Sequence, residues 1–508
     1  MVWKIDNPQC NESKKIVWEV AQYLRGRGLD VGAGDFRVLP HVITVDNMNH
    51  AQFGFVQKPD VVSDADKLDI FGSQTMDFVY SSHTLEHIVD TEATLKEWWR
   101  VLKVGGYLVL YLPHKNLYPN IGEVGSNPDH KHDFLPEDVV SKLPNGHDII
   151  RLEDRNEGIE YSFLLVVKKI QGKERLESYK KPRPEKTACV VRYGAYGDLM
   201  QASSVWAGLK SQGYHVTVFS SLPGADAVLH DPNIDDLILF DRDQVPNANL
   251  VDFWGVQKKK FDKWVNLSES VEGTLLALPG RTVHGYSTLL RHQLMNRNYV
   301  EMQHAIADVP YSKELFASKF YPTLEEKTWA LAERKRIGGD WLVMWSLAGS
   351  SPHKTWQGLD NILASLMVHY PTCRVVLVGG PEAVILEGGW ENENRIKKTC
   401  GKWNIRQTLS LLPHCDLVIG PETGVLNAAA CLPNKKIVFL SHSSEENLTR
   451  DWTNTQSLSP EGTSCYPCHQ LHYGWEHCHQ NKDTGTAQCQ VDISVERVWN
   501  AVETALGG

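Results

Sequence analysis

Short apolar runs alternate with amphipathic stretches along most of the 508-residue chain. The run WLVMWSL, residues 341–347, has the length and composition of a buried strand. The preceding stretch, residues 325–340, has the composition of a helix that ends at two glycines. Because strand-like and helical patterns alternate in this way, we expect an α/β fold class with mainly parallel sheets.

One segment interrupts this alternation. Residues 171–187, QGKERLESYKKPRPEKT, carry many charges, two prolines and almost no apolar side chains, which is typical of a linker. The run YSFLLVVKK, residues 161–169, is expected to be the last strand before this linker. A softer boundary falls near residues 325–340. The sequence therefore predicts three lobes, residues 1–170, 188–330 and 331–508.

The formal net charge of −10 argues against a protein that binds duplex nucleic acid, which needs a basic face. The first residues are polar and lack the apolar core of a signal peptide. No uninterrupted apolar run approaches the ~18 residues of a membrane span. We therefore expect a cytoplasmic chain without a membrane span.

The first lobe opens with a glycine turn after a strand-like run. GLDVGAG, which begins at Gly28, places Asp30, Gly32 and Gly34 at the end of that run, where glycine lets the backbone approach a ligand closely. A second run, VITVD, ends in Asp46, an acid placed to bind ribose hydroxyls. Gly34 and Asp46 are only 12 residues apart. This is short for a dinucleotide-binding fold, in which the acid that binds the ribose lies ~20 residues after the glycine motif.

These motifs, with DVVSDADKLD, MDFVYSSHTLEHIVD and the hairpin turn LKVGGYLVLYLP, resemble the class I S-adenosylmethionine-dependent methyltransferases, type 11-like, over roughly residues 25–170. The resemblance implies a Rossmann-like domain that binds S-adenosylmethionine. Phe36 lies in the region where a third glycine is common in this family. Carried over by position, Asp46 would hold the ribose. Asp64 and Ala65 would flank the adenine, and Ser81 and Ser82 would face the methionine moiety and the acceptor.

Three polar residues follow the fourth strand of this lobe. His83, Glu86 and His87 are spaced i, i+3 and i+4, so on a helix they would share one face. His83 is the candidate acceptor-side general base, because it lies nearest the end of the strand; His130 and His132 are rivals for this role. The trio could alternatively form a metal site, or His87 could be a packed structural residue.

The second lobe opens with CVVRYGAYGDLMQASSVWAGL, residues 189–209. This stretch resembles the amino-terminal lobe of glycosyltransferase family 9, the heptosyltransferase-like enzymes. The resemblance extends over about 320 residues and includes residues 231–243, 346–366, 375–382 and 411–432. It implies a GT-B fold, in which two Rossmann-like lobes face each other across a cleft. Asp198 would be the catalytic base; alternatively, this aspartate caps the following helix.

The third lobe carries the candidate donor-binding residues. Lys354 is the candidate ligand of the diphosphate, assisted by Ser346 and Ser350, since a charged hydrogen bond contributes roughly 1.5–3 kcal/mol. Lys354 could instead be a solvated surface lysine. Backbone amides near Thr423 and Gly424 would face the same anion, and Glu382 would hold the donor ribose.

Two positions depart from the family pattern. Glu422 stands where an aspartate is usual and Asn427 where a histidine is usual, which suggests an altered donor or acceptor, or reduced activity. The DRD triplet at Asp241 to Asp243 resembles the metal-binding pair of a different glycosyltransferase fold, although its neighbours match a metal-free family.

The segment 465–489 is rich in cysteine. Cys465, Cys468, Cys478 and Cys489 are spaced C-x2-C-x9-C-x10-C, a pattern typical of structural zinc. Free thiols or redox pairs are the alternatives, because similar cysteines recur as a loop feature in relatives of family 9.

Together these motifs predict a bifunctional transferase that moves a methyl group from S-adenosylmethionine and a sugar from a nucleotide-diphosphate sugar. The expected partners are these small-molecule donors and a glycan or glycosylated acceptor, so the product would be a methylated glycan. One alternative directs both activities at a nucleobase or nucleic acid, as in viral DNA hypermodification. Another is a lapsed enzyme that acts as a binding module.

Overall fold

The computed structural model describes residues 11–49, 58–222, 224–241, 243–268, 287–313, 319–349, 351–470, 472 and 474–507. These residues form two compact units. Unit 1 contains the described residues up to Glu185 together with Leu239–Phe261. Unit 2 contains Lys186–Ile238 and the described residues from Asp262 onward. The observed architecture is α/β in both units, as the alternating sequence pattern predicts.

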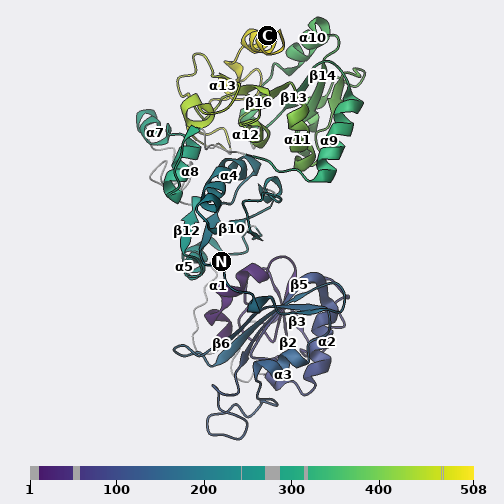
Figure 1. Cartoon of the computed structure of the whole chain (residues 1–508), viewed down its shortest axis with the longest axis vertical. Helices are drawn as coiled ribbons and strands as arrows, with labels where there is room; N and C mark the ends of the chain where they lie inside the picture. Colours follow the sequence, from purple (N-terminus) through teal and green to yellow (C-terminus); the bar gives the residue numbers. More distant parts are fainter. Residues whose placement is uncertain are drawn as a thin grey trace. The chain divides into compact units, whose positions relative to one another are not determined.

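Unit 1 is built on one sheet with the strand order β3-β2-β1-β4-β5-β7-β6-β8 (Figure 1). The neighbours among β1–β5 pair in parallel, and β7 pairs antiparallel with both β5 and β6. The strands are β1 (Gly28–Val31), β2 (Ile43–Asp46), β3 (Val61–Val62), β4 (Met76–Ser82), β5 (Leu102–Pro113), β6 (His147–Arg155), β7 (Ser162–Lys169) and β8 (Arg175–Leu176). The short strand β8 lies within the predicted linker.

Side chains alternate between the two faces of this sheet along each strand, and each face is covered by packed side chains. In β4, Val79 packs on one face with α2 (Thr91–Val101) and α3 (Pro136–Ser141). Phe78 and Tyr80 pack on the other face with α1 (Val17–Val20). The central strands therefore read as continuous apolar runs in the sequence.

Two local expectations in this unit are wrong. LKVGGYLVLYLP lies within one strand, β5, whose register with β4 shifts between Met76 and Phe78, and not in a hairpin. His83, Glu86 and His87 do not lie on one helix. A single 3₁₀ turn, η4 (Leu85–His87), follows β4. The next helix begins only after Asp90, whose side chain caps it by accepting a hydrogen bond from the Ala93 N–H at 2.9 Å.

A second segment of the chain completes unit 1. Helix α5 (Leu250–Lys258) lies beside α1 (Figure 1), and the rings of Phe253 and Trp18 meet edge to face at 6.4 Å. Gln257 donates a hydrogen bond to the Trp18 carbonyl. The side of α1 that carries Trp18 is thus covered by residues that lie far along the chain.

The first lobe of unit 2 is a four-stranded sheet with the order β11-β10-β9-β12. The pairs β10–β9 and β12–β9 are parallel. The strands are β9 (Thr187–Val191), β10 (His215–Ser220), β11 (Asp236–Leu239) and β12 (Lys263–Asn266). The helices are α4 (Tyr196–Ser211), α7 (Thr288–Met295) and α8 (Tyr299–Ala307). The strand, turn and helix expected over residues 189–209 are therefore β9, residues 192–195 and α4.

The second lobe of unit 2 has six parallel strands in the order β15-β14-β13-β16-β17-β18. The strands are β13 (Leu342–Ser346), β14 (Arg374–Val378), β15 (Ile396–Lys398), β16 (Leu417–Pro421), β17 (Lys435–Phe439) and β18 (Thr455–Leu458). The helices are α9 (Leu324–Ile337), α10 (Leu359–His369), α11 (Ile405–Leu411), α12 (Gly424–Ala429), α13 (Gln488–Val491) and α14 (Val495–Gly507).

The two lobes of unit 2 share one apolar core. Leu199 on α4 and Leu426 on α12 belong to the same cluster of buried side chains. The two helices begin very close together, since a Cβ at Gly424 would lie only 2.7 Å from the Tyr196 Cβ. Among the described residues, no helix combines the length and the apolar composition needed to span a lipid bilayer.

Candidate functional sites

The first candidate site is the glycine turn after β1. Gly32 has a φ of +75°, and a Cβ on it would lie 2.0 Å from the Thr84 hydroxyl oxygen. The Gly32 N–H donates to the Val45 carbonyl at 2.8 Å, which holds the turn against the end of β2. Only glycine fits this position, so the motif GLDVGAG meets a backbone requirement of the turn.

Both predicted acids of this turn bind its backbone. The Asp30 carboxylate accepts a hydrogen bond from the Val38 N–H at 2.7 Å, and burial raises the pKa of Asp30 to about 7. Asp46 accepts from the N–H groups of Gly34 at 2.9 Å and Met48 at 2.7 Å. Each carboxylate oxygen has a second acceptor site, so Asp46 retains capacity for ribose hydroxyls.

The other predicted cofactor residues differ in exposure. Ser81 is fully buried, and its hydroxyl donates to the Val31 carbonyl at 2.9 Å, which ties β4 to β1. Ser82 points to the opposite face, because neighbouring residues of a strand alternate. The Asp64 carboxylate is partly exposed and pairs with Lys67 at 2.6 Å, and the Ala65 carbonyl accepts from the Trp98 indole at 2.7 Å. The roles of these residues toward the cofactor stay predictions.

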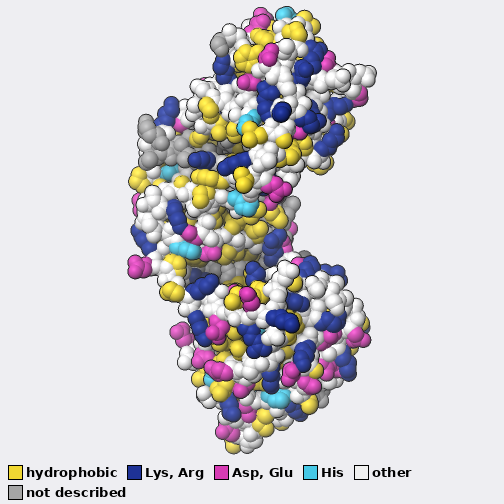
Figure 2. Space-filling view, turned by 45° about the vertical axis from the view of Figure 1, so that its right-hand side comes forward, with side chains coloured by type: hydrophobic (Ala, Val, Ile, Leu, Met, Phe, Trp, Pro, Cys, Tyr) yellow, Lys and Arg dark blue, Asp and Glu magenta, His cyan; other side chains and the backbone are white. Residues whose placement is uncertain are grey.

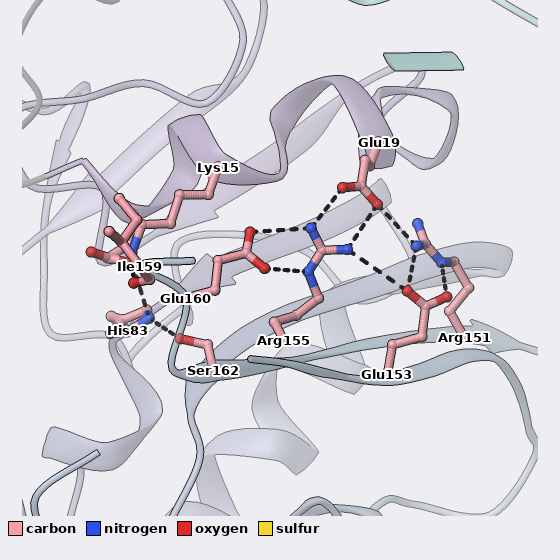
Figure 3. Close-up of polar contacts among 10 residues, drawn as sticks. Lys15, Glu19, His83, Arg151, Glu153, Arg155, Ile159, Glu160 and Ser162 are labelled. Carbon is pink, nitrogen blue, oxygen red and sulfur yellow. Dashed lines mark hydrogen bonds and ion pairs between the residues drawn. The ribbon is translucent and has the colours of Figure 1, made fainter. Parts of the chain in front are cut away.

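His83 stands directly after β4, as Figure 3 shows, with its Nε2 3.0 Å from the Ser162 hydroxyl. Burial lowers the pKa of His83 to about 3, so its imidazole is neutral near pH 7 and a weak proton acceptor. Close by, Arg155 bonds both Glu19 at 2.8 Å and Glu160 at 2.7 Å, and this network fixes α1 to β6 (Figure 3). The role of His83 as a base stays a prediction, and its low pKa does not favour it.

The second candidate site is a cavity of about 880 Å³ within unit 2. Side chains from the carboxyl ends of parallel strands in both lobes line it, as expected for Rossmann-like sheets. The predicted residues that line it are Asp198, Ser346, Lys354, Glu382, Glu422, Thr423 and Gly424. Ser350, the remaining predicted donor residue, lies outside the described residues.

Asp198 is the third residue of α4. One of its carboxylate oxygens accepts from the Ala195 N–H at 2.8 Å, and the other accepts from the Arg192 guanidinium, also at 2.8 Å. The side chain is 39% exposed and lines the cavity. Asp198 therefore satisfies a free N–H group at the start of the helix and still faces the space where an acceptor would lie.

Lys354 is not a solvated surface lysine. Its side chain is 11% exposed, and its ammonium donates to the Glu422 carbonyl at 3.2 Å. The ammonium also lies 3.8 Å from the Glu422 carboxylate. A lysine held in this way places a positive charge in the wall of the cavity.

Glu422 is a buried carboxylate with many hydrogen-bond donors. It accepts from the backbone N–H groups of Ser441 at 2.6 Å and Ser443 at 3.1 Å, and its other oxygen lies 2.7 Å from His442 Nδ1. Burial alone would raise the pKa of Glu422, but His442, Lys354 and the Ser441 N–H together hold it well below its usual range. The lysine, this carboxylate and the loop after β17 thus form one connected wall.

Asn427, the other departure from the family pattern, connects the two lobes. Its side-chain amide donates to the Thr423 carbonyl at 2.9 Å, and its oxygen accepts from the Gln201 amide at 2.9 Å. The Thr423 hydroxyl caps α12 through the Leu426 N–H and lies 3.3 Å from the Ser346 hydroxyl. This contact gives Asn427 a structural role that does not need a proton.

Sequence reasoning missed Arg192, His442 and Gln201. Arg192 is the first residue after β9, so its position at the carboxyl end of a central strand was a usable signal. His442 gave no signal of its own, because its contact with Glu422 depends on how two separate loops meet.

Of the predicted metal motifs, only the trio after β4 contributes to a group of possible ligands among the described residues, through Glu86 and His87. The cysteines of the segment 465–489 are free thiols, and burial raises the pKa of Cys468 to about 12 and of Cys478 to about 11. The described residues contain one group of three side chains that could hold a metal, and it includes neither these cysteines nor Asp241. Asp241 instead bonds Arg25 at 2.8 Å and the Gly26 N–H at 2.7 Å. Burial raises the pKa of the Cys489 thiol, Cys468, Cys478 and Cys465 lie near enough to raise it further, and zinc in the segment 465–489 stays a prediction.

Two family models match parts of the chain. Residues 29–110 match the family model described as Methyltransferase domain, and residues 255–477 match the model described as Glycosyltransferase family 9 (heptosyltransferase). No curated protein matches the chain significantly.

One solved structure similar to unit 2 is that of the E. coli ADP-heptose LPS heptosyltransferase II, which is 16% identical in sequence. The match covers 63% of this chain and 98% of that chain, with a TM-score of 0.45. Another is a family 9 glycosyltransferase from Veillonella parvula, with 17% identity, coverages of 64% and 98%, and a TM-score of 0.48. A putative methyltransferase from Bacillus halodurans is similar to unit 1, with 16% identity, coverages of 32% and 100%, and a TM-score of 0.24.

The two family matches define the chain as an enzyme of the transferase class. It carries a methyltransferase domain and a glycosyltransferase family 9 domain, which confirms both resemblances.

Proposed function

We propose that the chain transfers a methyl group from S-adenosylmethionine in unit 1 and a glycosyl group from a nucleotide-diphosphate sugar in unit 2. Both reactions would act on one glycan or glycosylated acceptor, so that the product is a methylated glycan. Joining the two activities in one chain raises the local concentration of the shared intermediate to about millimolar.

The observation that carries this proposal is that Asp198 and Lys354 line one cavity, although they lie in different lobes. Glycosyl transfer needs a cation at the leaving diphosphate and a base at the incoming hydroxyl. A cavity of about 880 Å³ lies within the range of small-molecule sites, about 300–1,000 Å³.

The chemistry follows from the positions of these residues. Lys354, with Ser346 beside it, would bind the diphosphate. Asp198 would accept the proton of the acceptor hydroxyl, whose oxygen then forms a bond to the anomeric carbon of the sugar. The bond from that carbon to the diphosphate oxygen breaks, and its electron pair goes to the leaving phosphate. Arg192 would position Asp198 by fixing one of its oxygens.

The net charge of −10 supports the choice of a small acceptor over nucleic acid. On the face shown in Figure 2, acidic and basic side chains are interspersed over most of the surface, and basic ones gather on part of the upper lobe.

The test measures donor affinity and donor turnover separately, in the full chain with a panel of nucleotide sugars. For Asp198→Asn we expect an unchanged calorimetric Kd and turnover lowered by roughly 10²–10⁴-fold, the usual contribution of a general base. For Lys354→Met we expect a Kd weakened by roughly 10–150-fold, because one charged hydrogen bond is lost.

Two exposed residues of unit 2 serve as matched controls. Asp236→Asn and Lys335→Met remove the same charges away from the cavity and should leave both quantities unchanged. If the donors bind but turnover is the same with and without Asp198, the proposed role of Asp198 is wrong and the binding-module alternative gains support.

A further inference from the structure

A second cluster of polar side chains lies in unit 1, beside η4. Glu86, His87 and His130 each offer one ligand atom, and these atoms all lie within 4.8 Å of one another. Glu86 and His130 are buried, and His87 is partly exposed. The proposed transfer of a methyl group assigns no role to any of the three.

The Glu86 carboxylate is the unusual member of this cluster. Its side chain is completely buried, and neither of its oxygens has a hydrogen-bond partner among the described residues. Burying a carboxylate in this way is costly by several kcal/mol unless a cation compensates it. A buried carboxyl group without donors is either protonated or paired with a cation, so the groups that face Glu86 decide between the two states.

Imidazole nitrogens surround one oxygen of this carboxylate. Glu86 Oε1 lies 3.9 Å from His87 Nε2 and 3.9 Å from His130 Nε2. His83 Nδ1 lies 3.8 Å from the same oxygen. These separations exceed hydrogen-bond length, so the groups face a common point without bonding one another.

The backbone holds this arrangement in place. The N–H groups of Lys131 and His132 both donate to the Glu86 carbonyl, at 2.7 and 3.2 Å, which fixes the loop that carries His130 over η4. The Tyr118 ring lies 5.4 Å from the His130 ring and supports it from another side. Residues 86 and 130 thus meet because two loops are bonded together, not because of helical spacing.

We propose that Glu86, His87 and His130 bind a divalent transition-metal cation, with His83 within reach as a further ligand. Two imidazoles and one carboxylate form a donor set that suits zinc, iron, cobalt or manganese better than calcium or magnesium. A tetrahedral ion with bonds of about 2.1 Å places its ligands roughly 3.4 Å apart. The separations between Glu86 Oε1 and the imidazole nitrogens, 3.8–3.9 Å, would need to shorten by a few tenths of an ångström. The ligand atoms of Glu86, His87 and His130 all lie within 4.8 Å of one another, so side-chain rotations would have to bring the two imidazoles closer as the ion binds.

The location suggests what the cation does, and this step rests on the proposed methyl transfer. Thr84, two residues before Glu86, has its hydroxyl 3.4 Å from the Val31 carbonyl, at the start of the predicted methyl-donor turn. A cation beside that turn would coordinate a hydroxyl or carboxylate oxygen of the acceptor. For a hydroxyl, coordination favours loss of the proton to solvent. The oxygen then takes the methyl group, and the electron pair of the broken carbon–sulfur bond returns to sulfur.

The experiment measures metal binding without relying on activity. The full chain is stripped with chelator and titrated with Mn²⁺, followed by electron paramagnetic resonance, and zinc is counted by mass spectrometry after dialysis against Zn²⁺. We expect Glu86→Gln and His130→Asn each to weaken Mn²⁺ binding at least tenfold and to lose one zinc equivalent. Any zinc held by the cysteines of residues 465–489 stays bound in both variants. The result is therefore the zinc content of each variant subtracted from that of the wild type.

His132→Asn is the matched control, because His132 lies two residues from His130 and its Nε2 faces the Val89 carbonyl at 3.2 Å. It should bind both metals as the wild type does. Calorimetry with S-adenosylmethionine, which should bind all variants alike, shows that the turn after β1 is folded. The inference is overturned if the wild type binds no metal that depends on Glu86, or if His132→Asn weakens binding as much as His130→Asn. Loss of S-adenosylmethionine binding by the wild type would instead contradict the proposed methyl transfer.

Discussion

Two turns in this molecule look alike and behave differently. The turn after β1 in unit 1 and the turn after β16 in unit 2 each follow a central parallel strand, and a buried acid and a glycine lie at each strand end. Asp30, the next-to-last residue of β1, has one backbone donor, the Val38 N–H. Glu422 in the second turn has two backbone donors, a lysine and a histidine.

The electrostatic outcome is opposite. Burial dominates at Asp30 and raises its pKa to about 7, whereas the donors and cations around Glu422 overcome burial and lower its pKa. A buried carboxylate is therefore charged or neutral according to its donors, not its residue type. The Glu422 side chain, longer than the aspartate expected at this position, reaches the loop after β17.

The largest expected effect comes from removing the charge of Glu422. Glu422→Gln should destabilise unit 2 by about 3–5 kcal/mol, because Lys354 and His442 lose their buried partner. Urea unfolding followed by hydrogen exchange, which assigns each transition to a unit, measures the difference. Glu325→Gln, an exposed position in the first turn of α9, should change stability by less than about 0.5 kcal/mol. Equal effects of the two changes would mean that the contacts of Glu422 contribute nothing.

The pH dependence of this difference has a defined sign. The pKa of Glu422 is lowered on folding, so its stabilising effect is present above the unfolded value, near 4.5, and is lost as the pH falls below it. The difference in the free energy of unfolding between the wild type and Glu422→Gln should therefore become smaller in acid.

Asp30 should show the reverse trend in unit 1. Because folding raises its pKa from 3.8 to about 7, its contribution to stability is full below pH 3.8 and is lost as the pH rises to about 7. Relative to Asp30→Asn, the wild type should lose at most about 1.4 kcal/mol for each pH unit in that window. The same unfolding measurement at pH 5 and pH 8 checks this. If the stability of the wild type relative to Asp30→Asn increased from pH 5 to pH 8, the prediction would be contradicted.

The smallest expected effect concerns the meeting of α4 and α12. Gly424→Ala places a Cβ 2.7 Å from the Tyr196 Cβ and should cost about 1–3 kcal/mol, because the two helix starts must separate. Gly255→Ala on α5 is the control: its Cβ meets nothing within 4 Å, and it should stabilise unit 1 by roughly 0.5–1 kcal/mol. Thermal unfolding of both variants measures the pair, and no loss in Gly424→Ala would show that the helix starts are free to move.

Much of the fold and of the cavity in unit 2 could be predicted from the sequence, for a simple reason. Buried parallel strands read as short apolar runs, and their carboxyl ends meet at one edge of the sheet. Residues placed just after such runs, Asp198 and Lys354 among them, therefore line the same cavity.

The rest depended on contacts that no local pattern encodes. The helical spacing of residues 83–87 suggested one face of a helix, but Asp90 starts the helix later, and a capping signal at that position was available. Alternation along β4 could have shown that Ser81 and Ser82 point to opposite faces of the sheet. The meeting of Glu86 with His130, and of Glu422 with His442, required knowledge of how distant loops are bonded.

Helix α5 has a consequence for how the chain is made. The ribosome completes the amino-terminal part of unit 1 before it reaches residues 239–261, so the side of α1 that carries Trp18 stays uncovered for several seconds at about 5–20 residues per second. A shortened gene that stops after residue 185 would leave that side bare permanently. The methyltransferase half of this polypeptide is therefore expected to be obtained in well-behaved form only when the later stretch is supplied with it.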